Sequence, residues 1–394
     1  MSPISVRLSS TLAVGSVIVL PVLASPAASA ASAASESAAP TLESSAPAPW
    51  ADSISDDHPD RGVLLTRGDI GTGVWYERGI AIAPRLQWNS NSGYCGETSF
   101  ISAGMYYGQY TSQWTARQLA SPGVPQTNPA SQLLLGRNDL AAARLMRLQV
   151  TRFAGASQRS TPQFLAWVKR QFVAGNVPII GVFNNLRMLD EPLRDGQPDY
   201  DHIVPVLGIG SQHRLDRNAG TYFPTDNITI SDNGLANVGP NRAYLYSYRF
   251  DWFPLTRNQA STPGGALYSI LNTPRNYGTS VSGVLDPDRV TIPVRLTSNV
   301  NGEGLLKKRR VSTPPPPIQL QLTATVKIAN QNRGYKVYLY DNFAKVPTEN
   351  FNAAAWKASR VWTIPAHHGP TWTTTIPALS NSTRVFRAVP NSAP

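Results

Sequence analysis

The sequence predicts an α+β domain with an antiparallel sheet, followed by a smaller all-β domain of the sandwich type. Three observations support this prediction. Helical patterns occupy the first half of the ordered region, short strand patterns follow them, and only strand patterns occur beyond residue 285. The length of 394 residues fits two such domains, or one large domain with a smaller one appended.

The first 60 residues are expected to precede the folded part. Arg7, an apolar run and a group of small residues form the pattern of a secretory signal peptide over residues 1–30. Residues 31–60 are rich in Ala, Ser, Pro and Asp without periodicity, and we expect them to form a disordered leader. The sequence therefore predicts a secreted protein, extracellular or on the cell surface, with no membrane span.

Three helices are predicted within the first domain, residues 61–285. They are expected over residues 93–110, 138–149 and 162–174, where apolar and small residues recur at helical spacing. The third has the clearest boundaries, because Ser160 or Thr161 can cap its start and Gly175 follows its end.

Strands are predicted where the pattern changes to β-branched and aromatic runs bounded by Gly, Asn and Asp. In the first domain they are expected over residues 177–183, 202–209, 227–231 and 242–248. In the second domain, residues 286–394, they are expected over residues 290–296, 320–328, 335–340, 361–364, 372–376 and 385–389. Short, regularly spaced strands of this kind are typical of a β-sandwich.

The positive charge is concentrated in the second domain. The formal net charge is +11, and residues 286–394 contain 14 Lys and Arg against 5 Asp and Glu. This asymmetry predicts an anionic cell-surface polymer as the partner of a separable second domain, with solubility as the alternative role of the charge. Neither a specific nucleic-acid partner nor an oligomer is predicted.

The metal-ligating residues are too few and too scattered for common metal sites. A single cysteine excludes an intramolecular disulfide framework and a Cys-cluster zinc site, and the five histidines have no HExxH-type spacing. We therefore expect chemistry that needs no metal and no organic cofactor.

Cys95 is the candidate nucleophile. It lies in the first turn of a predicted helix, where the helix dipole and free backbone N–H groups would lower the pKa of the thiol and stabilise the thiolate. Gly93 and Gly96 flank it and allow close approach of a substrate. The alternative is a lone cysteine that acts as a small buried apolar residue.

A thiolate nucleophile needs a proton acceptor and a group that orients it. His202 begins a predicted strand and can face a cleft from there. Asp232 follows the next strand and is the first choice for the acceptor that orients the imidazole, with Asn233 as the second choice. The alternative for this segment is a plain hairpin turn. Gln87 is the candidate oxyanion donor, and Asn89 or Asn91 could replace it.

These residues resemble the papain-like cysteine peptidases, and within them the bacteriocin-processing, double-glycine-peptidase-like branch. The resemblance covers about residues 80 to 250 and follows the family order of Gln, Cys, His and Asp or Asn. It implies Cys95 as nucleophile, His202 as general acid and base, Asp232 as orienting acceptor and Gln87 as oxyanion donor.

The function expected from this resemblance is that of a secreted cysteine peptidase that hydrolyses peptide bonds in peptide or protein substrates. A thiol acyltransferase or transamidase would use the same site, with an amine in place of the water. A non-catalytic surface-binding protein that acts through its C-terminal β domain is the alternative outside the enzyme class.

Overall fold

The computed structural model describes most of the chain beyond residue 62. The described residues are 63–70, 73–153, 160–185, 200–234, 245–255, 266–272, 275–303 and 310–392. The expected signal peptide and leader lie outside these residues, as does most of the basic segment 307–310.

The structure mixes helix and sheet, as the sequence predicts. The α-helices in the described residues are α1 (Cys95–Tyr106), α2 (Gln113–Ala120), α3 (Asp139–Leu145) and α4 (Thr161–Val173). Short 3-10 turns occur at Pro129–Ser131, Phe343–Lys345 and Ala355–Lys357. The predicted boundaries of α4 are confirmed, because Ser160 and Gln163 form a capping box at its start and Gly175, at a φ of +85°, follows its end.

A ten-stranded sheet forms most of the first part of the chain. Its strands are β1 (Val63–Ile70), β2 (Gly73–Gly79), β4 (Leu148–Arg152), β5 (Val177–Asn184), β6 (His202–Ser211), β7 (Asn227–Ser231), β8 (Leu245–Arg249), β9 (Pro254–Leu255), β10 (Tyr268–Leu271) and β11 (Gly278–Val284). The main path runs β1-β2-β6-β5-β10-β9, and all pairs are antiparallel except β9 with β10. Every residue of β5 and β6 is buried, so these strands form the centre of the core.

Two smaller sheets form the C-terminal part. One has the order β12-β13-β16, and the other has the order β15-β14-β17-β3. Their strands are β3 (Gln109–Tyr110), β12 (Val294–Ser298), β13 (Gln319–Lys327), β14 (Tyr335–Tyr340), β15 (Arg360–Ile364), β16 (Thr371–Leu379) and β17 (Arg384–Pro390). Alternate residues of β13 are buried, and the two sheets share one apolar core, which is the arrangement of a sandwich.

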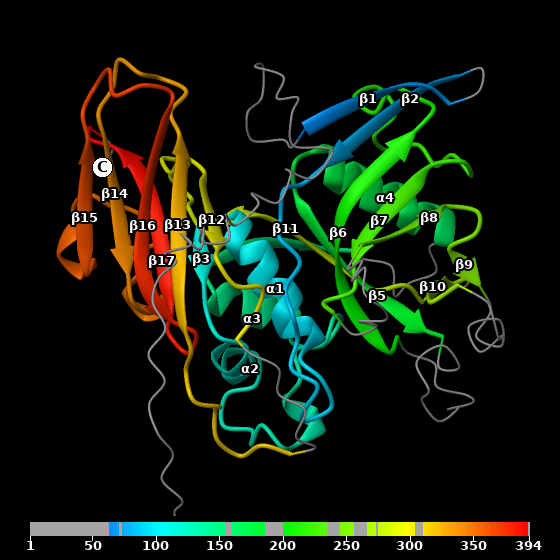
Figure 1. The fold of residues 1–394 in the computed structure, drawn as a ribbon, viewed down its shortest axis with the longest axis horizontal. Coiled ribbons are helices and arrows are strands. Elements are labelled where there is room, and N and C mark those ends of the chain that lie inside the picture. Colours follow the sequence, from blue (N-terminus) through cyan, green and yellow to red (C-terminus); the bar gives the residue numbers. More distant parts are fainter. Residues whose placement is uncertain are drawn as a thin grey trace, which may run out of the picture. The chain divides into compact units, whose positions relative to one another are not determined.

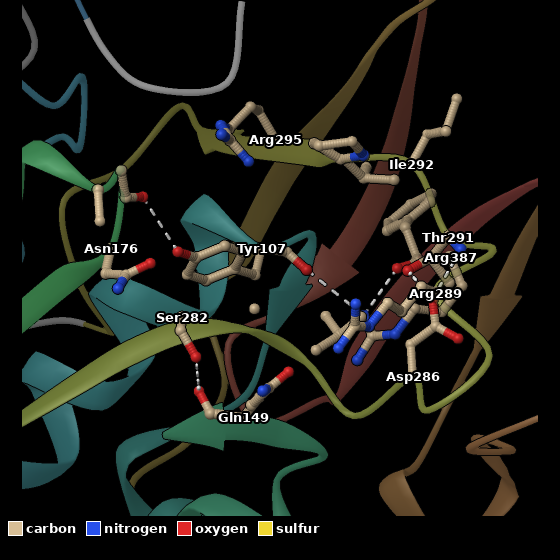
Figure 2. Close-up of a pocket in the computed structure, with 17 residues that line it drawn as sticks. Tyr107, Gln149, Asn176, Ser282, Asp286, Arg289, Thr291, Ile292, Arg295 and Arg387 are labelled. Carbon is tan, nitrogen blue, oxygen red and sulfur yellow. Dashed lines mark hydrogen bonds between the residues drawn. The ribbon is translucent and has the colours of Figure 1, made fainter. Parts of the chain in front are cut away.

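The two parts of the chain are joined through α1 and β3. Figure 1 shows α1 between the ten-stranded sheet and β12, and the short strand β3 pairs with β17. Ile101 and Met105 of α1 pack into the core of the C-terminal sheets. Arg387 donates hydrogen bonds to the Gln109 side chain at 2.8 Å and to the Tyr107 carbonyl at 3.4 Å, the second of which Figure 2 shows. The predicted boundary at residue 286 therefore falls between parts that share a sheet and a core.

Several elements differ from the sequence prediction. The helix predicted over residues 93–110 ends at Tyr106, and Gln109 and Tyr110 instead form β3, which pairs with β17. Strands β9, β10 and β11 are not among the predicted strands.

The helix predicted over residues 138–149 ends at Leu145, and Leu148 and Gln149 instead begin β4, because they pair with β11. The hairpin of β1 and β2 precedes all the helices, so the predicted order of helices before strands is wrong. Helix α2 was not expected, since its few apolar positions gave no clear helical pattern.

Candidate active site

Cys95 lies at the start of α1 and against β6. It is the first helical residue and is partly exposed. The backbone N–H groups of Gly96 and Ile203 face its thiol and act to lower the pKa of that group. One turn later, Ser99 Oγ donates to the Ile203 carbonyl at 3.0 Å. The candidate nucleophile is thus held next to the first residues of β6.

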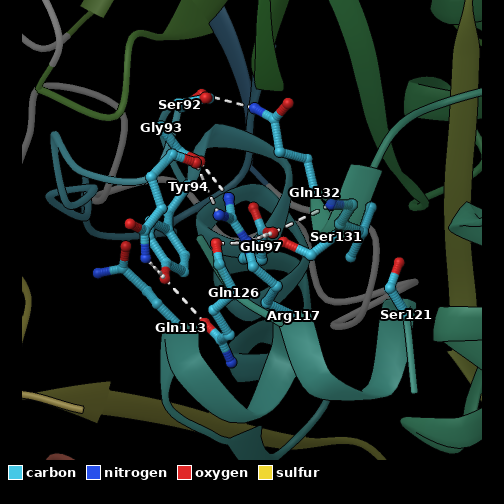
Figure 3. Close-up of polar contacts among 12 residues, drawn as sticks. Ser92, Gly93, Tyr94, Glu97, Gln113, Arg117, Ser121, Gln126, Ser131 and Gln132 are labelled. Carbon is cyan, nitrogen blue, oxygen red and sulfur yellow. Dashed lines mark hydrogen bonds and ion pairs between the residues drawn. The ribbon is translucent and has the colours of Figure 1, made fainter. Parts of the chain in front are cut away.

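A tight turn at residues 91–93 directly precedes the helix that begins with Cys95. Asn91, Ser92 and Gly93 adopt left-handed backbone angles, with φ values of 47°, 67° and 85°. Such angles are costly for residues other than glycine and persist only where surrounding contacts hold them. Here Arg117 of α2 donates to the Asn91 carbonyl at 2.9 Å and to the Gly93 carbonyl (Figure 3). This arginine therefore fixes the approach to the thiol.

The arginine that holds this turn is itself fixed by a buried ion pair. Arg117 Nε lies 2.6 Å from Glu97 Oε1, and both side chains are almost fully buried. Glu97 Oε1 also accepts from the Leu133 backbone N–H at 3.0 Å. The residue before Glu97 must be glycine, because a Cβ at Gly96 would lie 2.1 Å from the Leu133 carbonyl oxygen. The sequence analysis missed Glu97 and Arg117, although an acidic residue inside an apolar helix signals a buried partner.

His202 is the first residue of β6 and is almost fully buried, at 2% exposed. Its Nε2 hydrogen-bonds to the backbone carbonyl of Asp232 at 2.9 Å. Its ring stacks on Tyr268, with ring centroids 5.9 Å apart and an interplanar angle of 28°. The bond and the stacking fix the orientation of the imidazole.

Asp232 follows β7 directly, as predicted, but its backbone carbonyl is the acceptor for His202. The carboxylate accepts from the Gly234 backbone N–H at 2.7 Å and from the Tyr268 hydroxyl at 3.4 Å. The first of these bonds is typical of an Asx turn, so the segment serves both as a turn and as the orienting group. Tyr268 therefore contacts both the Asp232 carboxylate, through its hydroxyl, and the His202 imidazole, through its ring.

Asn233 joins the candidate residues to one another. Its side-chain amide donates to the Cys95 carbonyl at 3.2 Å, the Ser99 hydroxyl at 3.0 Å and the Ile203 carbonyl at 3.0 Å. The backbone carbonyl of Asn233 accepts from the Gln87 backbone N–H at 2.9 Å. Asn233 is thus bonded to the nucleophile helix, the histidine strand and the Gln87 segment. Its position differs from the sequence alternative, in which it orients His202.

Gln87 lies beside Asn233 and is buried, at 7% exposed. Its side-chain oxygen has no hydrogen-bond partner among the described residues. The two alternative oxyanion donors are less suitable. Asn89 is exposed, and the Asn91 amide group is engaged with the backbone N–H and carbonyl of Val311, each at 2.9 Å. Gln87 therefore remains the candidate donor.

The segment around Gln87 is held on both sides by Gln113 of α2. The Gln113 side chain donates to the Leu86 carbonyl at 3.0 Å and accepts from the Trp88 N–H at 2.8 Å. The Gln113 backbone N–H donates in turn to the buried carboxylate of Glu303 at 2.8 Å. Burial raises the pKa of Glu303 to about 8. Residues on both sides of position 286 thus fix the backbone from which Gln87 extends.

The electrostatics of the site differ from the sequence expectation. Burial, followed by the nearby charge of Glu97, raises the pKa of the Cys95 thiol to about 12, against the lowering effect of the Ile203 and Gly96 N–H groups. Burial also lowers the pKa of His202 to about 4. The prediction of a lowered thiol pKa is therefore wrong for this structure, because desolvation outweighs the helix dipole. The resting site contains a neutral thiol and a neutral imidazole.

No protein-family model, curated protein or solved structure matches the chain. The chemistry of the site is therefore inferred from its geometry. Within the described ranges, no three His, Cys, Asp or Glu side chains gather as a metal site would require. None of the helices in the described part is long and apolar enough to cross a membrane.

Proposed function

We propose that the chain is a cysteine hydrolase of the papain-like type that cleaves peptide bonds in peptide or protein substrates. The observation that carries this proposal is the hydrogen-bond network around Asp232 and Asn233. It links Cys95, His202 and Gln87, which are far apart in the sequence and which acyl transfer requires in one place. Export is part of the proposal and is based on the pattern of the first 30 residues.

The first half of the reaction forms a thioester. The Cys95 sulfur attacks the amide carbonyl carbon while the thiol proton passes to His202 Nδ1, since Nε2 is bonded to the Asp232 carbonyl. The backbone N–H of Cys95 and the Gln87 side-chain amide stabilise the oxyanion that develops. The imidazolium then donates its proton to the leaving amine, and the C–N bond breaks.

The second half regenerates the thiol. His202 takes a proton from a water molecule, the resulting hydroxide attacks the thioester, and the acid product leaves as the proton returns to sulfur. Because both groups are neutral at rest, proton transfer accompanies the attack instead of preceding it. Substrate binding that removes water from the site would make this transfer easier by strengthening its electrostatic interactions.

The experiment uses the full chain and mixed peptide substrates, with products identified by mass. Cys95→Ala and Cys95→Ser should remove hydrolysis while the circular-dichroism spectrum stays native, because both changes are small. An added primary amine tests acyl transfer, since its amide product differs in mass from the acid. Hydrolysis retained in Cys95→Ala would refute the proposed nucleophile.

A second candidate is a non-catalytic protein that keeps this arrangement as a structural core. The desolvation of the Cys95 thiol and the burial of His202 favour it, because the shifted pKa values keep both groups in their neutral forms at neutral pH. This candidate predicts that the wild type cleaves no peptide and forms no thioester. Detection of a Cys95 acyl-enzyme by intact mass, in the wild type or in a slowed His202→Gln variant, would refute it.

A further inference from the structure

A cavity with a volume of about 340 Å³ lies at the junction of the two parts of the chain (Figure 2). One wall comes from the first part and includes Tyr107, Asn176 and Ser282. The opposite wall follows the chain beyond residue 285 and includes β12 and β17. None of Cys95, His202, Asp232 and Gln87 lines it, so it is separate from the candidate active site. Its volume lies in the range of small-molecule sites.

The charged lining of this cavity is mainly basic. It contains three arginines, Arg289, Arg295 and Arg387, and one acid, Asp286. Asp286 Oδ2 accepts from the Thr291 backbone N–H at 2.7 Å and from its hydroxyl at 2.6 Å. The acid therefore shapes the 286–291 turn, and the net charge around the cavity stays positive. Low-dielectric walls of one charge sign concentrate an anion between them.

Arg387 forms the buried base of this positive region. It is 2% exposed, and its guanidinium donates only to neutral acceptors, the Phe386 and Tyr107 carbonyls and the Gln109 side chain. No carboxylate lies within ion-pair distance of it among the residues that the structure describes. Burial lowers the pKa of Arg387 to about 9, although the charge of Asp286 favours the guanidinium. Burial of this charge is therefore only partly compensated, and an anion nearby would offset more of its cost.

Arg295 is positioned in advance for an anion. Its guanidinium lies 3.5 Å from the centroid of the Tyr106 ring and also donates to the Tyr106 carbonyl. These contacts hold the side chain in place, so less conformational entropy is lost when it binds a ligand. Arg289 is exposed on the opposite side of the cavity, next to Arg387 in Figure 2. Asn176, Gln149 and Ser282 supply neutral polar groups along the remaining wall.

We propose that this junction cavity binds a small organic anion whose carboxylate or phosphate groups are held by Arg295 on one side of the cavity and by Arg289, next to the buried Arg387, on the other. Because its walls come from both parts of the chain, the bound anion stabilises their association. The proposal is independent of the proposed hydrolase activity.

The test is isothermal titration calorimetry and thermal unfolding of the full chain. Inorganic phosphate and citrate are the anionic probes and sorbitol is the neutral one, all at constant ionic strength set with sodium chloride. We expect saturable binding of at least one anion and a rise in melting temperature with its concentration. The tighter of the two anions identifies the preferred group, phosphate or carboxylate.

Variants on the surface of the cavity locate the site. Arg289→Gln and Arg295→Gln should each weaken anion binding about tenfold, the loss of one charge-assisted hydrogen bond. Arg289 is exposed, so its variant should fold normally. Arg333→Gln is the matched control, because Arg333 is exposed and does not line the cavity. The proposal is overturned if neither anion binds saturably, if sorbitol binds as well as the anions, or if Arg333→Gln weakens binding as much as Arg289→Gln.

Discussion

At the scale of single residues, the desolvation of the Cys95 thiol determines how fast it reacts. The pKa of its thiol is raised to about 12, so the thiolate is scarce at neutral pH. We predict that alkylation of the folded chain by iodoacetamide accelerates steadily from pH 7 to pH 10. At pH 8 it should be on the order of a hundredfold to a thousandfold slower than in the urea-unfolded chain. The rates are followed by intact mass. Fast labelling near pH 5 would instead demonstrate a thiolate–imidazolium pair.

His202 makes stability depend on pH. Burial lowers its pKa from 6.5 to about 4, so between these values the unfolded chain binds a proton that the folded chain does not. The free energy of unfolding should therefore fall as the pH is lowered from about 6.5 to about 4, by about 3 kcal/mol from this residue. His202→Gln should remove that part of the pH dependence. Urea unfolding across this range measures both chains, and identical slopes would contradict the prediction.

Replacing the side chain of Asn233 should reduce stability and activity more than replacing that of Asp232. The carbonyl that orients His202 belongs to the backbone and survives Asp232→Ala, whereas Asn233→Ala removes an amide that bonds α1 to β6. We predict a loss of about 2–3 kcal/mol in unfolding free energy for Asn233→Ala, because two buried carbonyls lose a partner. Asn233→Gly is the matched control for the left-handed φ of 53°. If Asn233→Gly has full stability and activity, the loss in Asn233→Ala comes from its backbone angle and not from the missing amide, which contradicts the prediction.

The sequence could identify these residues but not their chemical state. Cys95, His202 and Asp232 each lie at the end of a predictable element, and the antiparallel pairing of β6 with β7 brings the start of the His202 strand near Asp232. The pKa values of Cys95 and His202 depend on desolvation by residues distant in sequence, and the use of the Asp232 backbone carbonyl depends on the exact path of the turn. Neither can be read from a local pattern.

At the scale of elements, α2 fixes the backbone around Gln87, the proposed oxyanion donor. The Gln113 side chain bonds the backbone on both sides of Gln87, at Leu86 and Trp88. We predict that Gln113→Ala lowers kcat about tenfold or more with little change in KM, since Gln87 would engage only the developing oxyanion. Gln163→Ala, which breaks the capping box of α4, is the control. It should lower the melting temperature without changing kcat.

Equal losses of kcat in both variants would show that general destabilisation, and not the position of Gln87, explains the effect. A rise in KM alone for Gln113→Ala would move the role of this segment to substrate binding. Steady-state kinetics, measured at a temperature where the two variants are fully folded, distinguish these two outcomes from the predicted loss of kcat in Gln113→Ala alone.

The elements themselves were predictable where the local signals agree. Helix α4 has a cap, a proline near its start and a terminal glycine, and β7 lies at its predicted bounds. The start of β4 was not predictable from its own residues, because Leu148 and Gln149 continue a helical pattern and become a strand only through pairing with β11. A tertiary contact overrides local propensity at this point.

At the scale of the whole molecule, the two predicted domains depend on each other. The β12-β13-β16 and β15-β14-β17 strands follow the sequence prediction closely, but their core includes Tyr110 of β3 and Ala116 of α2. A pattern of alternating residues reveals which face of a strand is buried, but not which element covers it. The contribution of β3 to the C-terminal sheet could therefore not be inferred from either segment alone.

Removal of the chain beyond residue 285 tests this dependence. The truncated chain would lose the Asn301 carbonyl and the Glu303 carboxylate, which hold Leu86 and Gln113, and it would expose the apolar face of α1. We predict that it is inactive on a small soluble peptide and unfolds at a much lower temperature than the full chain. A single substitution at the contact between β3 and the C-terminal sheets should also lower the free energy of unfolding. Tyr110→Phe removes one hydrogen bond to the Ser380 carbonyl and should cost about 1 kcal/mol. If the truncated chain instead keeps its fold and its peptide cleavage, the C-terminal sheets form a separable accessory domain.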